Sequence, residues 1–292
     1  MSKFIQAIKM RNIGRNIFLV FTVAALAALT NNLEEVWSYD EERAQVGRIY
    51  NYERSNTDGT KTERVSVYHK SSKLLEVYKE NGLCQNAALV SADMNWTTMS
   101  ASRITGGALL PNAQREEFAF MTFDPIGKKL DMVVQLPDME IKDFAPIPVA
   151  PWHLYDFDFA SLTVATPHLK FAENGFTFGM SLLWADPSVD DPLTWMGNIE
   201  AVYEAREVHL EISTLKFNLS GTALDGSAPD GSIPVSYMGT LWLDEKDGHI
   251  VDAILPAPNH PGYSDFRLKL LSVSDGGEKE WTEKLTNHFK DC

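Results

Sequence analysis

The side chains best suited to metal chemistry lie in the segment 248–266, GHIVDAILPAPNHPGYSDF. His249, His260 and Asp265 offer two imidazoles and a carboxylate, a set that zinc accepts with a water as fourth ligand. They converge if His249 and Asp265 lie on paired antiparallel strands. One reading is therefore a metal-assisted hydrolase, and the other is that these are ordinary polar residues around a proline-rich loop.

A second group of residues that could bind a metal or act in acid–base catalysis lies in the segment 151–159, PWHLYDFDF. On a strand, His153 would face away from Asp156 and Asp158, and on a helix only one carboxylate would join the histidine. Two ligands are too few for a stable metal site. The arrangement favours a structural role over a catalytic one.

In that structural role, Asp158 would cap a short helix over 159–165 that ends before Pro167. Trp152 and Tyr155 would then plug one end of a curved sheet, since aromatic-rich corners are usually packed. The usual catalytic and cofactor motifs are absent: G-x-S-x-G, G-x-G-x-x-G, G-x-x-x-x-G-K-[ST], H-E-x-x-H and C-x-x-C. The sequence thus leans away from an enzyme and indicates no cofactor.

The first thirty residues have the form of a secretory signal peptide. Four basic residues precede an uncharged apolar run over 17–29, and Ala25-Leu26-Ala27 provides a cleavage site. We predict a signal peptide over 1–27, a single antiparallel β domain over 28–292, and a periplasmic or secreted protein; the alternative is an uncleaved membrane anchor.

The net charge limits the partners that the protein can bind, and the two cysteines bear on the compartment in which it folds. Cleavage after Ala27 would remove four of the 26 Lys and Arg and none of the 40 Asp and Glu, which moves the net charge from −14 to about −18. Such a chain repels nucleic acid, so no nucleic-acid partner is predicted, whereas an envelope protein partner stays open. Cys84 and Cys292 either pair, as an oxidising compartment favours, or remain free thiols.

Period-2 alternation of apolar residues dominates the chain and predicts strands with one buried face. The clearest case is the segment 176–184, FTFGMSLLW. The same alternation recurs in the segments 129–136, KLDMVVQL, and 266–270, FRLKL. Asp-Gly turns separate strands at 46–54 and 62–69, and at 238–243 and 249–254. Further strands are expected at 74–79, 86–92, 98–104, 116–123, 139–144 and 198–206.

Two other patterns shape the predicted sheet. In VHLEISTLKFNL, 208–219, the apolar residues change parity, which we interpret as a bulge at Ser213-Thr214 that bends the sheet. Helical spacing predicts a short C-terminal helix within 276–289 and, more weakly, a helix within 31–45. The expected fold is all-β: a large, strongly curved antiparallel sheet, half-barrel or barrel, with a short C-terminal helix.

The order of these parts resembles the periplasmic lipoprotein and lipid carriers of the LolA/LppX type. A signal peptide is followed by the hairpin YNYERSNTDGTKTERVSVYH, and GTLWLDEKDGHIVDAIL and FRLKLLS come last. The resemblance is one of pattern and covers most of the mature chain. It implies a half-barrel sheet around an acyl-chain cavity.

Small residues in the strand 176–184 also leave room for a cavity. Gly175, Thr177, Gly179 and Ser181 free one face of bulk, although close packing of a filled core would explain them equally. We predict a non-catalytic binder of a hydrophobic or lipid-like ligand; the alternatives are the hydrolase and an envelope scaffold or partner-binding module. The predicted ligand-binding residues are Trp152, Tyr155, Phe176, Phe178, Met180, Trp184 and Trp242.

Overall fold

The structure is a computed structural model that describes residues 33, 35–184, 186, 189–225 and 238–292. Its strands are β1 (Ile49–Ser55), β2 (Glu63–His69), β3 (Leu74–Glu80), β4 (Ala87–Asn95), β5 (Ser100–Leu110), β6 (Gln114–Asp124), β7 (Lys129–Leu136), β8 (Met139–Pro146), β9 (Trp152–Leu154), β10 (Phe176–Leu183), β11 (Leu193–His209), β12 (Ile212–Ser220), β13 (Gly239–Asp244), β14 (Ile250–Leu255) and β15 (Phe266–Ser274). The α-helices are α2 (Ala160–Ala165) and α3 (Gly277–Asn287), and the 3-10 helices are η1 (Glu41–Arg43), η2 (Pro111–Ala113), η3 (Tyr155–Phe157), η4 (Thr166–His168), η5 (Ala172–Asn174) and η6 (Thr222–Leu224).

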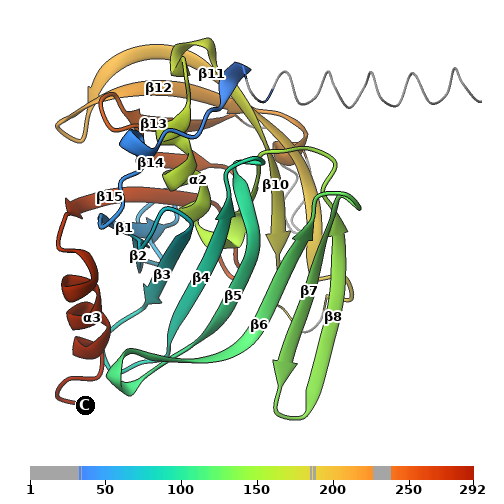
Figure 1. The fold of residues 1–292 in the computed structure, drawn as a ribbon, viewed down its shortest axis with the longest axis vertical. Helices are drawn as coiled ribbons and strands as arrows, with labels where there is room; N and C mark the ends of the chain where they lie inside the picture. Colours follow the sequence, from blue (N-terminus) through green and yellow to red (C-terminus); the bar gives the residue numbers. More distant parts are fainter. Residues whose placement is uncertain (1–32, 34, 185, 187–188, 226–237) are drawn as a thin grey trace, which may run out of the picture.

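These strands form one curved sheet in the order β8-β7-β6-β5-β4-β3-β2-β1-β15-β14-β13-β12-β11-β10-β9 (Figure 1). Neighbours are antiparallel except β9 and β10, which run parallel. Within the described residues β8 and β9 end the order, so the sheet is open. The predicted fold class is therefore confirmed, with the half-barrel form rather than the closed one.

The alternation read from the sequence matches the burial of the strands. In β10, Phe176, Phe178, Met180 and Leu182 are all buried, and Trp184 just beyond the strand continues that row. In β15, Phe266 and Leu268 are fully buried. Because side chains on one face of a strand recur at every second position, these rows build the core on the inner side of the sheet.

The predicted bulge at Ser213-Thr214 is wrong, because the chain reverses direction just before it. His209 of β11 pairs with Ile212 of β12, and the two residues between them, Leu210 and Glu211, form the turn with φ of 51° and 66°. A two-residue hairpin turn needs such positive φ values. The apolar parity changes there because two strands meet, not because one strand is bent.

The segment inside the curve of the sheet holds α2, which is surrounded by strands in Figure 1. Its residues Ala160–Ala165 match the predicted helix, and all six are buried. The predicted cap is wrong: the N-cap is Phe159, and no side chain caps the helix. Asp158 instead points to the basic side chains of Arg54 and Lys79, because a fully buried carboxylate needs a counter-charge.

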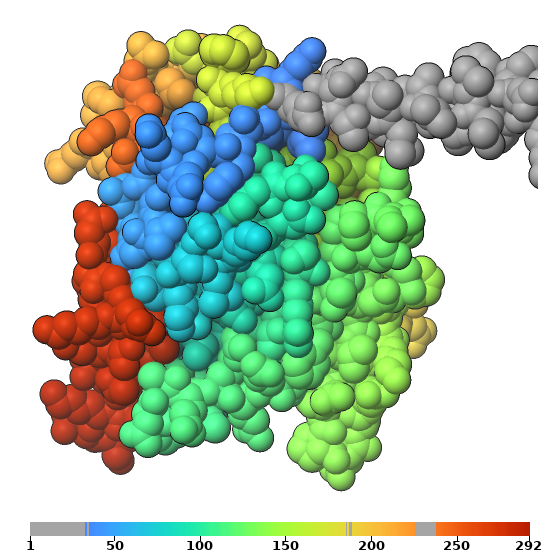
Figure 2. Space-filling view, viewed as in Figure 1, coloured from blue at the N-terminus to red at the C-terminus, as the bar shows by residue number. Residues whose placement is uncertain are grey.

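The other face of the sheet is covered by α3, the predicted C-terminal helix. Its Trp281 and Leu285 pack in a second core with Tyr68, Tyr78 and Leu89. In the space-filling view α3 (red) lies beside the surface formed by the cyan and green strands (Figure 2). This second core lies on the side of the sheet opposite α2, so both faces of β2–β5 are partly covered.

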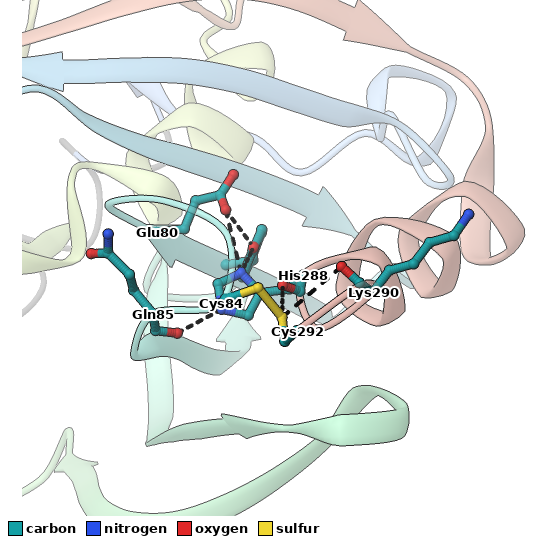
Figure 3. The surroundings of a disulfide bond; sticks show 7 residues. Glu80, Cys84, Gln85, His288, Lys290 and Cys292 are labelled. Atoms are coloured by element: carbon teal, nitrogen blue, oxygen red, sulfur yellow. Dashed lines mark hydrogen bonds and ion pairs between the residues drawn. A yellow bond between two sulfur atoms is a disulfide. The ribbon is translucent and has the colours of Figure 1, made fainter.

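A disulfide fixes the end of α3 to the loop after β3. Cys84 and Cys292 are bonded, with their Cα atoms 5.6 Å apart (Figure 3). Beside the bond, His288 Nε2 lies 2.7 Å from the carbonyl oxygen of Gln85, and the Cys84 amide donates to the His288 carbonyl at 3.0 Å. The C-terminus is thereby held against strands that lie some 200 positions earlier.

The predictions for the N-terminal region are tested only in part. The signal peptide, 1–27, lies outside the described residues. Of the helix expected within 31–45, the described residues Leu33, Glu35 and Val36 are helical. Farther along, Trp37 bridges to Leu169, and the helical part of 38–45 is η1 (Glu41–Arg43). Over the described part of the chain, no helix has the length and apolar character needed to span a bilayer.

Candidate ligand-binding site

A hollow of about 750 Å³ opens between the inner face of β2–β6 and the segments that lie over it. This volume is within the range of about 300–1,000 Å³ that small-molecule pockets occupy. Its walls are mainly apolar. The lining residues are Glu63, Lys79, Asn81, Asn86, Ala87, Ala88, Val90, Ile104, Gly106, Gly107, Ala108, Phe118, Ala119, Met121, Leu154, Asp156, Phe157, Leu183, His260 and Tyr263.

The hollow exists because the strands beneath it carry small side chains. Ala88 of β4, Gly106 and Ala108 of β5, and Ala119 of β6 line it where larger residues would fill the space. Each is only half-buried, unlike the core residues around them. A Cβ on Gly106 would lie 3.4 Å from the Cβ of Ala119, which is an ordinary contact. The backbone therefore does not require a glycine here, and the missing side chain leaves space in the hollow.

A bulge in β6 shapes the same wall. The register of β5 and β6 shifts between Gly106 and Gly107, which leaves Phe118 as the extra residue, and Phe118 lines the hollow. Gly107 is needed there because a Cβ would lie 2.2 Å from the carbonyl oxygen of Glu116. A bulge re-aims side chains locally, and here it adds an aromatic wall to a floor of small residues.

One end of the hollow is polar. Glu63, Lys79, Asp156 and His260 line it there, and Tyr263 stands beside them. Lys79 donates to the backbone carbonyl of Asp156 and forms an ion pair with Asp158 at 2.5 Å. An ammonium has three donor hydrogens, so Lys79 keeps one beyond these two partners.

Behind this end lies a fully buried ionic cluster. Arg54 and Asp158 are both 0% exposed, and Arg54 Nε lies 3.9 Å from the Asp158 carboxylate. The amide of Asn259 donates to Asp158 at 2.8 Å, and its oxygen accepts from Arg54. The Arg54 guanidinium also lies 3.3 Å from the centre of the Tyr263 ring. The polar end is thus held in place by contacts from β1, β3 and the loop after β14.

The ionisation of this end follows from burial and from the neighbouring charges. Burial raises the pKa of Asp156 to about 7, although Lys79 opposes the shift. Burial, with Lys79, lowers the pKa of His260 to about 3, so the imidazole is neutral at physiological pH. Burial alone would lower the pKa of Lys79, but the carboxylates of Asp158 and Glu63 outweigh it and the pKa is raised. Lys79 is the cation that faces the hollow.

Replacing Asp156 with asparagine should remove a pH dependence of stability. The folded-state pKa of about 7 exceeds the unfolded value of about 4, so the folded state holds this proton more tightly. The stabilisation from this group is complete below about pH 4 and is lost as the pH rises through 7. The free energy of unfolding of the variant should therefore rise relative to that of the wild type by a few kcal/mol from about pH 5 to about pH 8.

Urea unfolding of both proteins at the two pH values measures this gain. The comparison isolates Asp156, because the buried histidines, whose lowered pKa values act in the opposite direction, are common to both proteins. Asparagine retains the oxygen that accepts from the Leu183 amide at 3.2 Å. An equal difference in unfolding free energy at both pH values would contradict the assignment.

The ligand-binding residues predicted from the sequence lie elsewhere. All seven are buried in the core, with exposed fractions of 8% or less, and none lines the 750 Å³ hollow. They are Trp152, Tyr155, Phe176, Phe178, Met180, Trp184 and Trp242. Phe176 lines a second hollow, of about 500 Å³, next to Trp37.

The predicted small face of the strand 176–184 is open at one end, where Gly175 and Thr177 line the 500 Å³ hollow, and filled farther along. A Cβ on Gly179 would lie 2.1 Å from the Trp195 ring and 3.0 Å from Val149, so those side chains occupy the space. Ser181 is fully buried. The prediction of space at Gly179 and Ser181 is therefore wrong, and the small residues that line the 750 Å³ hollow lie on β4, β5 and β6.

The three predicted metal ligands are in different surroundings. His260 lines the polar end of the hollow. Asp265 accepts from the amide and the hydroxyl of Thr57, both at 2.7 Å. His249 lies near Asp244 and Asp247, and this is the group of potential ligands that the described residues bring together. The predicted combination of His249, His260 and Asp265 does not form such a group.

No protein-family model matches the chain, and no curated protein matches its sequence. Among solved structures, the lipoprotein LppX of Mycobacterium tuberculosis is similar, with 13% identity and a TM-score of 0.25, over 84% of this chain and 94% of that one. The fold and the hollow themselves define a protein with an open, curved β-sheet around a partly apolar cavity.

Proposed function

We propose that this protein binds an apolar or amphiphilic small molecule in the 750 Å³ hollow, without covalent chemistry. The observation that carries the proposal is a cavity of ligand size whose floor is made of alanine and glycine and whose walls include Phe118, Phe157 and Met121. Burial of an apolar ligand against such walls contributes about 25 cal/mol per Å² of apolar surface removed from water.

The polar end gives the ligand an orientation. An apolar chain fits along β4–β6, and a hydrogen-bonding group at its end fits beside Lys79, Asp156 and His260. Because Lys79 stays charged and His260 stays neutral, an acceptor group of the ligand finds a cationic donor there. A lipid-like ligand with a polar head meets both requirements.

Filling the hollow should abolish ligand binding. Gly106→Phe places an aromatic ring against Ala119 and into the space, so a fluorescent fatty acid should bind at least about tenfold more weakly, or about 1.4 kcal/mol. Ala119→Phe should do the same from the neighbouring strand. The measurement is a fluorescence titration of the folded proteins, together with native mass spectrometry of the wild type after mild extraction.

The matched control is Thr122→Phe. Thr122 is exposed on β6, one position from Met121 and therefore on the opposite face, so the variant adds the same ring outside the hollow. Equal affinity of wild type, Gly106→Phe and Ala119→Phe for the fatty acid would refute the proposal. So would a wild type that neither carries a lipid nor binds the probe.

Export of the protein is part of the proposal. The disulfide between Cys84 and Cys292 supports it, because such bonds persist in oxidising compartments. The predicted cleavage after Ala27 and an envelope protein partner stay predictions. The metal-assisted hydrolase has no support from the positions of His249, His260 and Asp265.

A further inference from the structure

A buried histidine just before β14 lacks hydrogen-bond partners. His249 is 4% exposed, and neither of its ring nitrogens has a partner. Its ring lies 5.1 Å from that of the buried Tyr50. A buried polar group left unpaired costs about 1–3 kcal/mol. An imidazole with both nitrogens unpaired is a side chain to which a ligand can supply what the chain does not.

Two carboxylates approach His249 from the turn between β13 and β14. One oxygen of Asp244, one oxygen of Asp247 and a ring nitrogen of His249 all lie within 4.8 Å of one another. Both aspartates are half-buried, so the group is reachable from solvent. An unpaired imidazole and two carboxylates at this separation match the donor set of a divalent metal site.

The turn that carries the carboxylates is fixed by its own hydrogen bonds. Asp244 Oδ1 accepts from the amides of Lys246 and Asp247 at 2.9 and 2.5 Å. The Asp244 amide donates to the His249 carbonyl at 2.8 Å. Gly248 has φ of 77°, and a Cβ on it would lie 2.8 Å from Pro167 Cα, so the turn is pressed against the interior segment.

One cationic side chain, Arg48, already lies beside these carboxylates. Arg48 Nη1 pairs with Asp247 Oδ2 at 2.7 Å, and its Nε pairs with Asp275 at 3.0 Å. Arg48 therefore takes one oxygen of Asp247 and shares its charge with Asp275. The second carboxylate oxygen of Asp247 and the carboxylate of Asp244 are the negative groups offered to an ion beside His249.

We propose that Asp244, Asp247 and His249 bind one divalent transition-metal ion of the Zn²⁺ or Mn²⁺ class. Imidazole nitrogen with carboxylate oxygen suits these ions, whereas Ca²⁺ and Mg²⁺ prefer oxygen ligands alone. Three protein ligands leave a coordination position for water or an external group. The site shares no residue with the ligand cavity, so it is independent of the proposed function.

Isothermal titration of the tag-free, chelator-treated full chain with ZnCl₂ and CaCl₂ tests the site. One Zn²⁺ should bind per chain, and Ca²⁺ should not displace it. Asp244→Asn keeps the oxygen that accepts from the turn amides but removes the charged ligand, so it should weaken Zn²⁺ binding at least about tenfold. Asp275→Asn, which loses a partner of Arg48 but no proposed ligand, should bind Zn²⁺ as the wild type does.

A second measurement does not depend on a variant that folds. In the wild type, the ring-nitrogen NMR signals of one histidine should shift on addition of ZnCl₂, and CaCl₂ should not produce the same shift. The proposal is overturned if Zn²⁺ does not bind, if Asp244→Asn and wild type bind it equally, or if no histidine signal responds.

Discussion

Replacement of Asp158 with alanine should lower the free energy of unfolding by about 3–5 kcal/mol. Asp158 is fully buried and is the shared counter-charge of Lys79, at 2.5 Å, and Arg54, at 3.9 Å. Its removal leaves two positive side chains inside the protein, where they cannot recover the hydration they lost on folding. Urea unfolding followed by tryptophan fluorescence gives the difference.

Two comparisons identify burial as the cause. Asp158→Asn keeps an oxygen to accept from Asn259 and should recover part of the loss. Glu173→Ala breaks an ion pair with Arg206 of similar length, 2.9 Å, in which both side chains are more than half exposed, and should cost no more than about 1 kcal/mol. Comparable losses for Asp158→Ala and Glu173→Ala would show that the cluster does not act as a buried charge network.

The double substitution Cys84→Ser/Cys292→Ser should lower the free energy of unfolding by about 2–5 kcal/mol. The bond joins positions 208 apart, so it removes much conformational freedom from the unfolded chain. It also holds α3, whose Trp281 covers Tyr68 on the second core, with ring centres 5.3 Å apart. Chemical unfolding gives the loss, and amide hydrogen exchange should show α3 exchanging faster than β2 and β3.

A reducing agent supplies the control. It should destabilise the wild type by about as much as the double substitution does, and it should leave the double variant unchanged. If the wild type unfolds at the same denaturant concentration with and without reductant, the bond does not contribute to stability.

The strands could be predicted from the sequence because burial on one face imposes a period of two. Phe176 through Trp184 show it plainly, and α3 is equally clear from Trp281 and Leu285. Local pattern did not distinguish a bulge from a turn at Leu210-Glu211, because neither residue is one of the glycines or asparagines that usually adopt positive φ. The turn is set by the pairing of β11 with β12.

The candidate site was harder to predict, because it is formed by small side chains that leave space unfilled. Aromatic residues such as Trp152 and Phe178 were predicted to bind the ligand, but large apolar side chains are most often buried in the core, as these two are. The hollow depends on Ala88, Ala108 and Ala119, whose small size carries no pattern in a single sequence. That these three alanines and Gly106 lie together on adjacent strands can be recognised only when the register of β4, β5 and β6 is known.

The central pair of the sheet has a consequence for how the protein folds. β1 and β15 lie side by side, Ile49 opposite Ser274, whereas the other neighbouring strands of the described chain follow one another in sequence. Each half can therefore assemble from short-range hairpins, but the seam between them closes over a loop of more than 200 residues and must wait until the last strand has been synthesised. Until then β1 has an unsatisfied edge, and a chain released without its final strand would expose that edge to other molecules.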